Sequence, residues 1–219
     1  MPRLKLDTHI RRDQIAEATL ALVAESGLSR LSVAAVARRV GFSPAALYRH
    51  FPGKDAIMDA VLERMAAHMS AIVGQATTGA GDEVDALRRL HALHGTLMRQ
   101  NQALFPVLLS DAFQSGSLDR RRRVFALVSG YIDRVAVLIR SGQKHGAIRR
   151  DTSARALATL FFGTVQPPAM LWVMSGGTYD PRRTGREAWR VFEEILRGSP
   201  ARPRARGSDR ERRPTENQP

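Results

Sequence analysis

Residues 31–51, which read LSVAAVARRVGFSPAALYRHF, constrain the fold more than any other part of the chain. Apolar residues recur at helical spacing as far as Val40, and Gly41 follows at the point where glycine ends a helix at least cost. Ser43 and Pro44 restart the chain, because serine is a good N-cap and proline is a good first helical residue. The pattern predicts two short helices joined by a tight turn.

The second predicted helix, residues 44–50, is too short to be stable alone and needs a neighbour to dock on. Small residues at its front would let it enter the major groove of DNA, and donors at its end could hold phosphates. Those donors are Tyr48, Arg49, His50 and, one turn later, Lys54. A DNA-reading helix-turn-helix and a surface helical hairpin with incidental charges both fit the capping signals.

A wider set of residues narrows this choice. The most specific piece is LYRHFPGKDAI, and the other matching residues are Ile15, Ala18, Leu22, Gly27, Leu31, Val33, Val36, Ala37 and Gly41. On these residues the stretch from about 12 to 62 resembles the DNA-binding domain of the tetracycline-repressor (TetR/AcrR) family, which typically reads LY.HF..K here. The resemblance covers about a quarter of the chain.

The resemblance implies a role for each part of the reading unit. Tyr48, His50 and Lys54 match positions that usually hold phosphates, and Arg49 lies on the helix face that is turned towards bases. Arginine can donate two hydrogen bonds to guanine, but a phosphate contact by Arg49 stays an equal alternative. The full set of expected DNA contacts is Ser32, Val33, Ser43, Pro44, Ala45, Ala46, Tyr48, Arg49, His50 and Lys54. The alanines offer apolar contact alone, so part of the specificity would come from DNA shape.

Composition favours a helical protein of ordinary hydrophobicity. The chain has 219 residues, of which 43% are hydrophobic and 6% aromatic, and alternating strand patterns are nearly absent. It has no cysteine, and no signal-peptide or membrane-spanning pattern is evident, so we expect a cytoplasmic protein without a membrane partner. A net charge of +13 suggests a polyanionic partner, but residues 1–65 carry ten Lys and Arg against seven Asp and Glu. Bulk charge therefore does not locate the DNA surface.

Helical periodicity continues to residue 197 and predicts an all-α fold of about nine helices. We expect a DNA-binding domain at 1–56, a helical effector-binding and dimerisation domain at 57–197, and a disordered basic tail at 198–219. Beyond the reading unit the predicted helices span about 11–26, 53–75, 82–100, 102–113, 117–144, 152 onward and 181–197. Pro167 and Pro168 are expected to end or kink the penultimate helix. The charge run at 120–123 is expected to be a solvated face.

Methionines and aromatic residues in the second domain fit a hydrophobic core and also suit an adaptable apolar pocket. Because this domain resembles a ligand chamber in the family, we expect a pocket drawn from Met65, Met69, Met98, Phe105, Phe125, Tyr131, Phe162 and Trp172. Asn101, Gln102, Tyr131 and Gln166 are candidate polar contacts within it. His91 and His94 have metal-ligand spacing, but core histidines are the favoured interpretation because no third ligand is evident. We therefore expect no metal and no cofactor.

These features predict a homodimeric repressor that binds a palindromic operator in double-stranded DNA. A small apolar ligand would release it by moving the helix that begins near residue 53. The dimer surface is expected on the last two long helices, with Phe161, Val165, Trp189 and Phe192. A ligand-independent DNA-binding protein that acts through protein partners or nucleoid structure is the alternative. An enzyme has little support, because the sequence lacks HExxH, GxSxG and a glycine-rich phosphate loop.

Overall fold

The computed structural model describes residues 8–101, 103 and 118–198. Within these ranges every regular element is helical, which confirms the predicted all-α class. The elements are α1 (Thr8–Ser26), the 3-10 helix η1 (Leu28–Arg30), α2 (Val33–Arg39), α3 (Pro44–Tyr48), α4 (Lys54–Thr77), α5 (Glu83–Gln100), α8 (Leu118–His145), α9 (Ala154–Met174) and α10 (Pro181–Arg197). The helix predicted at 102–113 and the tail predicted at 198–219 lie outside the described residues, except for residues 103 and 198.

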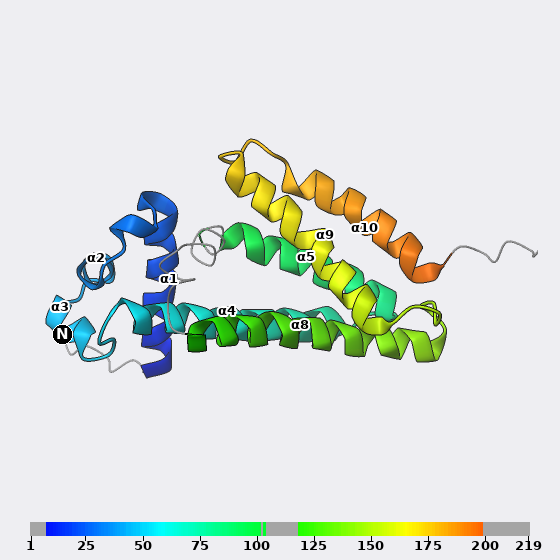
Figure 1. Ribbon diagram of the computed structural model, residues 1–219, viewed down its shortest axis with the longest axis horizontal. Helices are drawn as coiled ribbons and strands as arrows, with labels where there is room; N and C mark the ends of the chain where they lie inside the picture. The colour runs from blue at the N-terminus through cyan, green and yellow to red at the C-terminus, as the bar shows by residue number, and fades with distance from the viewer. Residues whose placement is uncertain (1–7, 102, 104–117, 199–219) are drawn as a thin grey trace, which may run out of the picture.

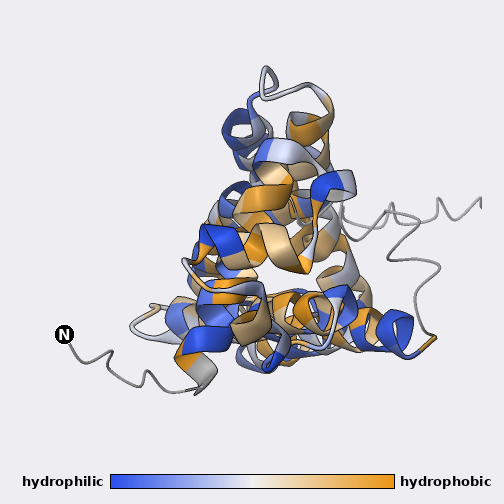
Figure 2. Cartoon of the chain, turned by 90° about the vertical axis from the view of Figure 1, so that its left-hand side faces the viewer, coloured by the Kyte–Doolittle hydropathy of each residue, from blue (hydrophilic) through white to orange (hydrophobic). Residues whose placement is uncertain are grey.

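The molecule divides into a small head, built from α1, α2 and α3, and a larger bundle (Figure 1). Helix α4 begins in the head, packs against α1, and then runs along α8 through the length of the bundle (Figure 1). Helices α5, α9 and α10 cover the opposite side, with α9 packed against α5, α8 and α10. Most helices carry hydrophobic residues on one side and hydrophilic residues on the other, as Figure 2 shows, so each buries one stripe. Because α4 belongs to both parts, movement of the bundle can reach the head through it.

Helix α9 passes through Pro167 and Pro168 without a break, so the predicted end of the helix there is wrong. Pro168 has no amide hydrogen, which leaves the carbonyl of Thr164 without its usual partner four residues on. That carbonyl raises the pKa of His91 on α5, although burial lowers the same pKa more strongly. Pro168 is itself buried, and packing around the helix compensates for the missing amide.

Helix α9 is apolar on two faces and is the one described helix long and apolar enough to cross a membrane. One face is buried within the bundle, whereas Leu160, Met170, Leu171 and Met174 are between 37% and 73% exposed. The residues expected at a dimer surface belong to the buried face: Phe161, Val165, Trp189 and Phe192 are at most 7% exposed. That prediction is therefore wrong for these four residues. Apolar periodicity showed that α9 and α10 carry apolar residues but could not say which of two apolar stripes faces inward. A dimer surface on these two helices stays a prediction.

The fold buries one residue of the charge run at 120–123 and exposes the other three. Arg121, Arg122 and Arg123 are exposed, as expected, but Arg120 is only 4% exposed. Its guanidinium lies 2.9 Å from the carboxylate of Asp55 and 3.5 Å from that of Asp59, both in the first turns of α4. Arg120 thus ties the start of α8 to the end of α4 that adjoins the head. The prediction of a solvated face is wrong for this one residue, because the contact depends on a partner from a distant part of the chain.

Candidate nucleic-acid interface

The turn between α2 and α3 is built as the sequence predicts. Ser32 caps α2 by accepting a hydrogen bond from the amide of Ala35 at 3.1 Å. Gly41 adopts φ +74°, a left-handed conformation that favours glycine, and the amide of Phe42 then closes the end of α2 by donating to the carbonyl of Ala37. Ser43 caps α3 by accepting from the amide of Ala46 at 3.2 Å. Two caps and one glycine therefore set the angle at which α3 leaves α2.

Helix α3 has only five residues and is held in place by its buried side. Leu47 and, just beyond the helix, Phe51 are fully buried in the head. The opposite side is open: Tyr48 is 52% exposed, and Arg49 and His50 are exposed beside it. Among the described residues, no side-chain hydrogen bond or ion pair engages these three. The structure thus presents three donors on a capped turn, and nothing in the described part of the protomer satisfies them.

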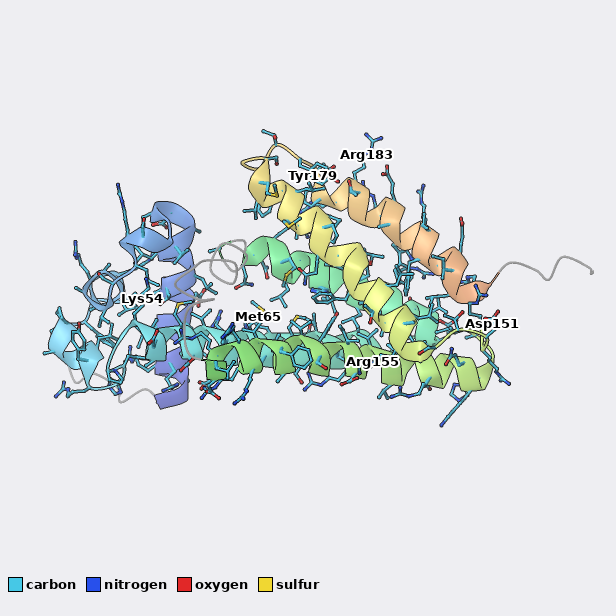
Figure 3. The ribbon with its side chains drawn as sticks, viewed as in Figure 1. Lys54, Met65, Asp151, Arg155, Tyr179 and Arg183 are labelled. Carbon is cyan, nitrogen blue, oxygen red and sulfur yellow. The ribbon has the colours of Figure 1, made fainter. Side chains whose placement is uncertain are left out.

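The remaining predicted contacts lie around this cluster with one qualification. Ser32, Ser43, Pro44 and Ala45 are exposed, Ala46 is half-buried, and Lys54 begins α4 at the head end of the molecule (Figure 3). Val33 is different, because its side chain is 6% exposed and belongs to the core. A contact from Val33 to DNA would have to use its backbone amide at the start of α2.

The arginines of the head separate into two groups that the sequence could not distinguish. Arg39 forms a two-pronged pair with Glu25, with N–O distances of 2.6 and 2.7 Å. Arg12 pairs with Glu63 and covers the ring of Phe51 at 5.2 Å, while Arg11 covers the ring of Phe42. Arg38 is exposed at the end of α2, and no ion pair engages it within the described residues. Arg38 is a candidate phosphate contact that sequence reasoning missed, because only the helical phase shows which of two adjacent arginines meets Glu25.

The residues predicted to line an effector pocket do not form one group. Met65, Met69 and Met98 are buried in the core, and the ring of Tyr131 lies 6.2 Å from that of Phe162. Phe125 is 73% exposed on α8, so this protomer does not enclose it. Trp172 lies in a separate open pocket that α1 and α9 share. Phe105 and Gln102 fall outside the described residues.

A hydrogen-bonded chain runs through the centre of the bundle. The hydroxyl of Tyr131 lies 3.0 Å from Nδ1 of His94, and the Gln166 amide lies 3.4 Å from Nε2 of the same ring. Complete burial lowers the pKa of His94 to about 3, and burial also raises the pKa of Tyr131 above its ordinary value. The ring is therefore neutral at pH 7 and Tyr131 keeps its proton. Two of the four candidate polar contacts, Tyr131 and Gln166, thus meet at one histidine.

His91 lies one turn before His94 on α5, and its ring makes fewer hydrogen bonds. Its ring packs against those of Phe161 and Trp189, and burial lowers its pKa to about 4. The Thr164 carbonyl partly opposes this lowering of the pKa, and Nε2 is buried without a hydrogen-bond partner in the described part of the chain. In the described part of the chain no cluster of three metal-ligating side chains includes either histidine.

Comparison with known proteins accounts for nearly all of the described fold. Residues 15–61 match the family model of bacterial regulatory proteins of the tetR family, and residues 61–195 match that of the YsiA-like protein C-terminal region. The nucleoid occlusion factor SlmA of Marinobacter nauticus is 29% identical over 86% of this chain and 96% of its own. The fatty acid metabolism regulator protein of Bacillus subtilis is 22% identical over 76% of this chain and 86% of its own.

A solved structure agrees with this assignment at the level of the fold. The transcriptional regulator FadR from Bacillus subtilis, in complex with stearoyl-CoA, has a TM-score of 0.70 and 19% identity, and the match covers 84% of this chain and 98% of that one. The two family models together span residues 15–195, and the exposed donors at the end of α3 lie within the first of them. The chain belongs to the tetR family of bacterial regulatory proteins and is a DNA-binding regulator of transcription, not an enzyme.

Proposed function

We propose that the protein is a homodimeric repressor that binds a palindromic operator through α3 and is released by a small apolar effector. The observation that carries this proposal is the cluster of Tyr48, Arg49 and His50, which is exposed, rigidly placed and without partners among the described residues. Donors held in this way lose little conformational entropy when they meet phosphates or base edges. The head corresponds to residues 1–56 and the effector and dimerisation domain to residues 57–197.

A second copy of the chain is the partner that the apolar face of α9 and α10 fits. Leu160, Met170, Leu171 and Met174 of α9, with Val191 of α10, leave a large apolar surface in water. One reading unit makes few base contacts, and two units related by a two-fold axis read two half-sites. Leu160→Asp with Leu171→Asp is expected to give monomers by sedimentation velocity and to abolish specific operator binding. The matched control is Val137→Asp, since Val137 is an equally exposed apolar residue on α8.

Movement of α4 would couple effector to operator. Arg120 of the effector domain contacts Asp55 and Asp59 at the head end of α4. The buried residues Met65 and Met69 follow on the same helix. A ligand that displaces the methionines in one state only would change the spacing of the two heads. Arg120→Met should leave operator binding intact but reduce the response to ligand. Retention of the full response would assign the coupling to another contact.

An acyl-CoA, whose acyl chain would be the apolar part of the effector, is the first class to test, because one relative is named a fatty acid metabolism regulator and one neighbour holds stearoyl-CoA. Genome fragments bound by the protein would first define the operator. Operator affinity is then measured with and without stearoyl-CoA and with free coenzyme A as the matched control. A fall in affinity with the acyl form alone supports the proposal, and binding without any change in operator affinity contradicts it.

A ligand-independent role in nucleoid organisation is the second candidate. It is favoured by the similarity to the nucleoid occlusion factor SlmA over 86% of this chain. That role predicts many binding sites spread over the chromosome, whereas a repressor predicts a few sites beside promoters. The same selection of genome fragments distinguishes the two. In either role the protein would act on the nucleoid in the cytoplasm.

A further inference from the structure

A pocket of about 220 Å³ lies between the outer side of α5 and the first turns of α10. Helix α5 contributes His91, Ala92, Gly95, Thr96 and Arg99, and α10 contributes Pro181, Arg182, Gly185 and Arg186. None of these residues belongs to the proposed reading surface or to the methionine-rich core. Figure 3 labels two residues at this end of α10: Tyr179 in the turn between α9 and α10, and Arg183 in the first turn of α10.

Positive charge in the pocket exceeds negative charge. Arg99, Arg182 and Arg186 have no ion pair within the described residues. The nearest carboxylate, Asp180, caps α10 by accepting from the amides of Arg182 and Arg183 at 2.9 and 3.2 Å. Burial and then the charge of Arg182 lower the pKa of Arg99, while the charge of Asp180 raises it, so Asp180 compensates the positive charge of the pocket only in part.

The guanidinium of Arg99 is already directed into the pocket. Its Nη2 donates to the hydroxyl of Thr96 at 2.9 Å, which folds the side chain back along α5. A Cβ added at Gly95 would lie 3.5 Å from Nη1 of Arg99, so the guanidinium rests over the bare backbone at this glycine. Arg182 and Arg186 approach from α10, and the three cations therefore surround one small volume.

His91 forms a neutral wall of the pocket. Its side chain is nine-tenths buried, and burial lowers its pKa to about 4, so the ring carries no charge at pH 7. A Cβ added at Gly185 would lie 3.6 Å from Cε1 of His91, so α10 packs closely against the ring at this glycine. The pocket thus combines three charged donors with an uncharged wall.

We infer that this pocket binds a phosphate group, with Arg99, Arg182 and Arg186 donating to its charged oxygens. Guanidinium groups suit tetrahedral oxyanions, because each can donate two parallel hydrogen bonds. Free phosphate and a phosphate monoester on a larger carrier share this chemistry.

Calorimetric titration of the full chain at pH 7 tests the assignment without DNA or effector. Inorganic phosphate should bind once per protomer. Arg99→Gln and Arg182→Gln should each weaken phosphate binding about tenfold or more, since each removes a charge-assisted hydrogen bond. The matched control Arg190→Gln removes an exposed arginine further along α10 and should leave binding unchanged.

The other outcomes overturn the assignment. Absence of saturable binding, or equal losses in Arg99→Gln and Arg190→Gln, would show that the pocket is not an anion site. Adenosine 3′,5′-bisphosphate separates the two sources: tighter binding than inorganic phosphate identifies a monoester, and weaker binding identifies the free ion. All of these readouts are independent of operator binding, so they hold whether or not the protein is a repressor.

Discussion

The head exposes a cluster of polar side chains, whereas the core of the bundle buries polar side chains with partners. On the head, Tyr48, Arg49 and His50 stand in water without partners among the described residues. In the bundle, His94 and Tyr131 are fully buried and bonded to each other, and Arg120 is buried against two carboxylates. A buried polar group must find its partner inside the protein, whereas an exposed group can wait for an external one. The exposed cluster of the head is therefore free to meet another molecule, whereas these buried groups of the bundle hold the geometry of its core.

The largest expected effect is a fall in the free energy of unfolding at low pH, which tests the burial of the two histidines. The folded-state pKa values of His91 and His94 lie at about 4 and 3, below the ordinary 6.5. Below pH 6.5 the unfolded chain therefore binds protons at these histidines that the native state does not bind. Their contribution to the free energy of unfolding is fully present above pH 6.5 and is lost as the pH falls towards the folded-state pKa values. Between pH 7 and pH 5 the free energy of unfolding should fall by about 2 kcal/mol for each histidine.

Urea unfolding at the two pH values measures this loss. His94→Gln should remove about half of the pH dependence, because one of the two refused protons is gone. A pH-independent free energy of unfolding over this range would show that water reaches the rings and that the bundle is not closed around them.

The next effect tests the exposed side. Arg49→Ala should cost about 1–3 kcal/mol in operator binding and relax the preference at one base position if Arg49 reads a base. The measurement is a binding titration against operators substituted one position at a time, with Arg140→Ala as an exposed arginine control on α8. A uniform loss over all sequences would instead identify a phosphate contact.

A smaller effect tests whether the buried chain depends on its bonds or on its shape. Tyr131→Phe keeps the ring but leaves Nδ1 of His94 without the hydroxyl, and should lower the free energy of unfolding by about 1–2 kcal/mol. Tyr48→Phe on the head removes the same atom from an exposed residue and should leave stability unchanged. Equal losses in the two variants would contradict the difference between head and bundle.

The smallest effect concerns the cap that orients the exposed cluster. Ser43→Ala should destabilise the start of α3 by about 1 kcal/mol, and Ser43→Gly by only a few tenths, because glycine tolerates the cap conformation. Operator affinity should follow the same order in a binding titration. An alanine variant that binds as well as the glycine variant would show that docking of Leu47, and not the cap, positions α3.

Local signals determined the head almost completely. Ser32, Gly41, Ser43 and Pro44 act on their immediate neighbours, so their sequence positions alone predicted both short helices and the turn between them. The exposed donors of α3 followed from the same pattern, and residues 44–50 resembled the family closely enough to imply their roles. Contact with DNA at each of these positions stays a prediction.

Only the tertiary structure decided features that depend on partners far along the chain. Helix α9 continues through two prolines because packing against α5, α8 and α10 compensates for the amide hydrogen that Pro168 lacks. Arg120 is buried, and Arg39 rather than Arg38 is paired, because Asp55, Asp59 and Glu25 happen to face them. Periodicity shows that a helix has an apolar stripe, but the choice between two stripes, or between two adjacent arginines, is made by whichever neighbour the fold brings within reach.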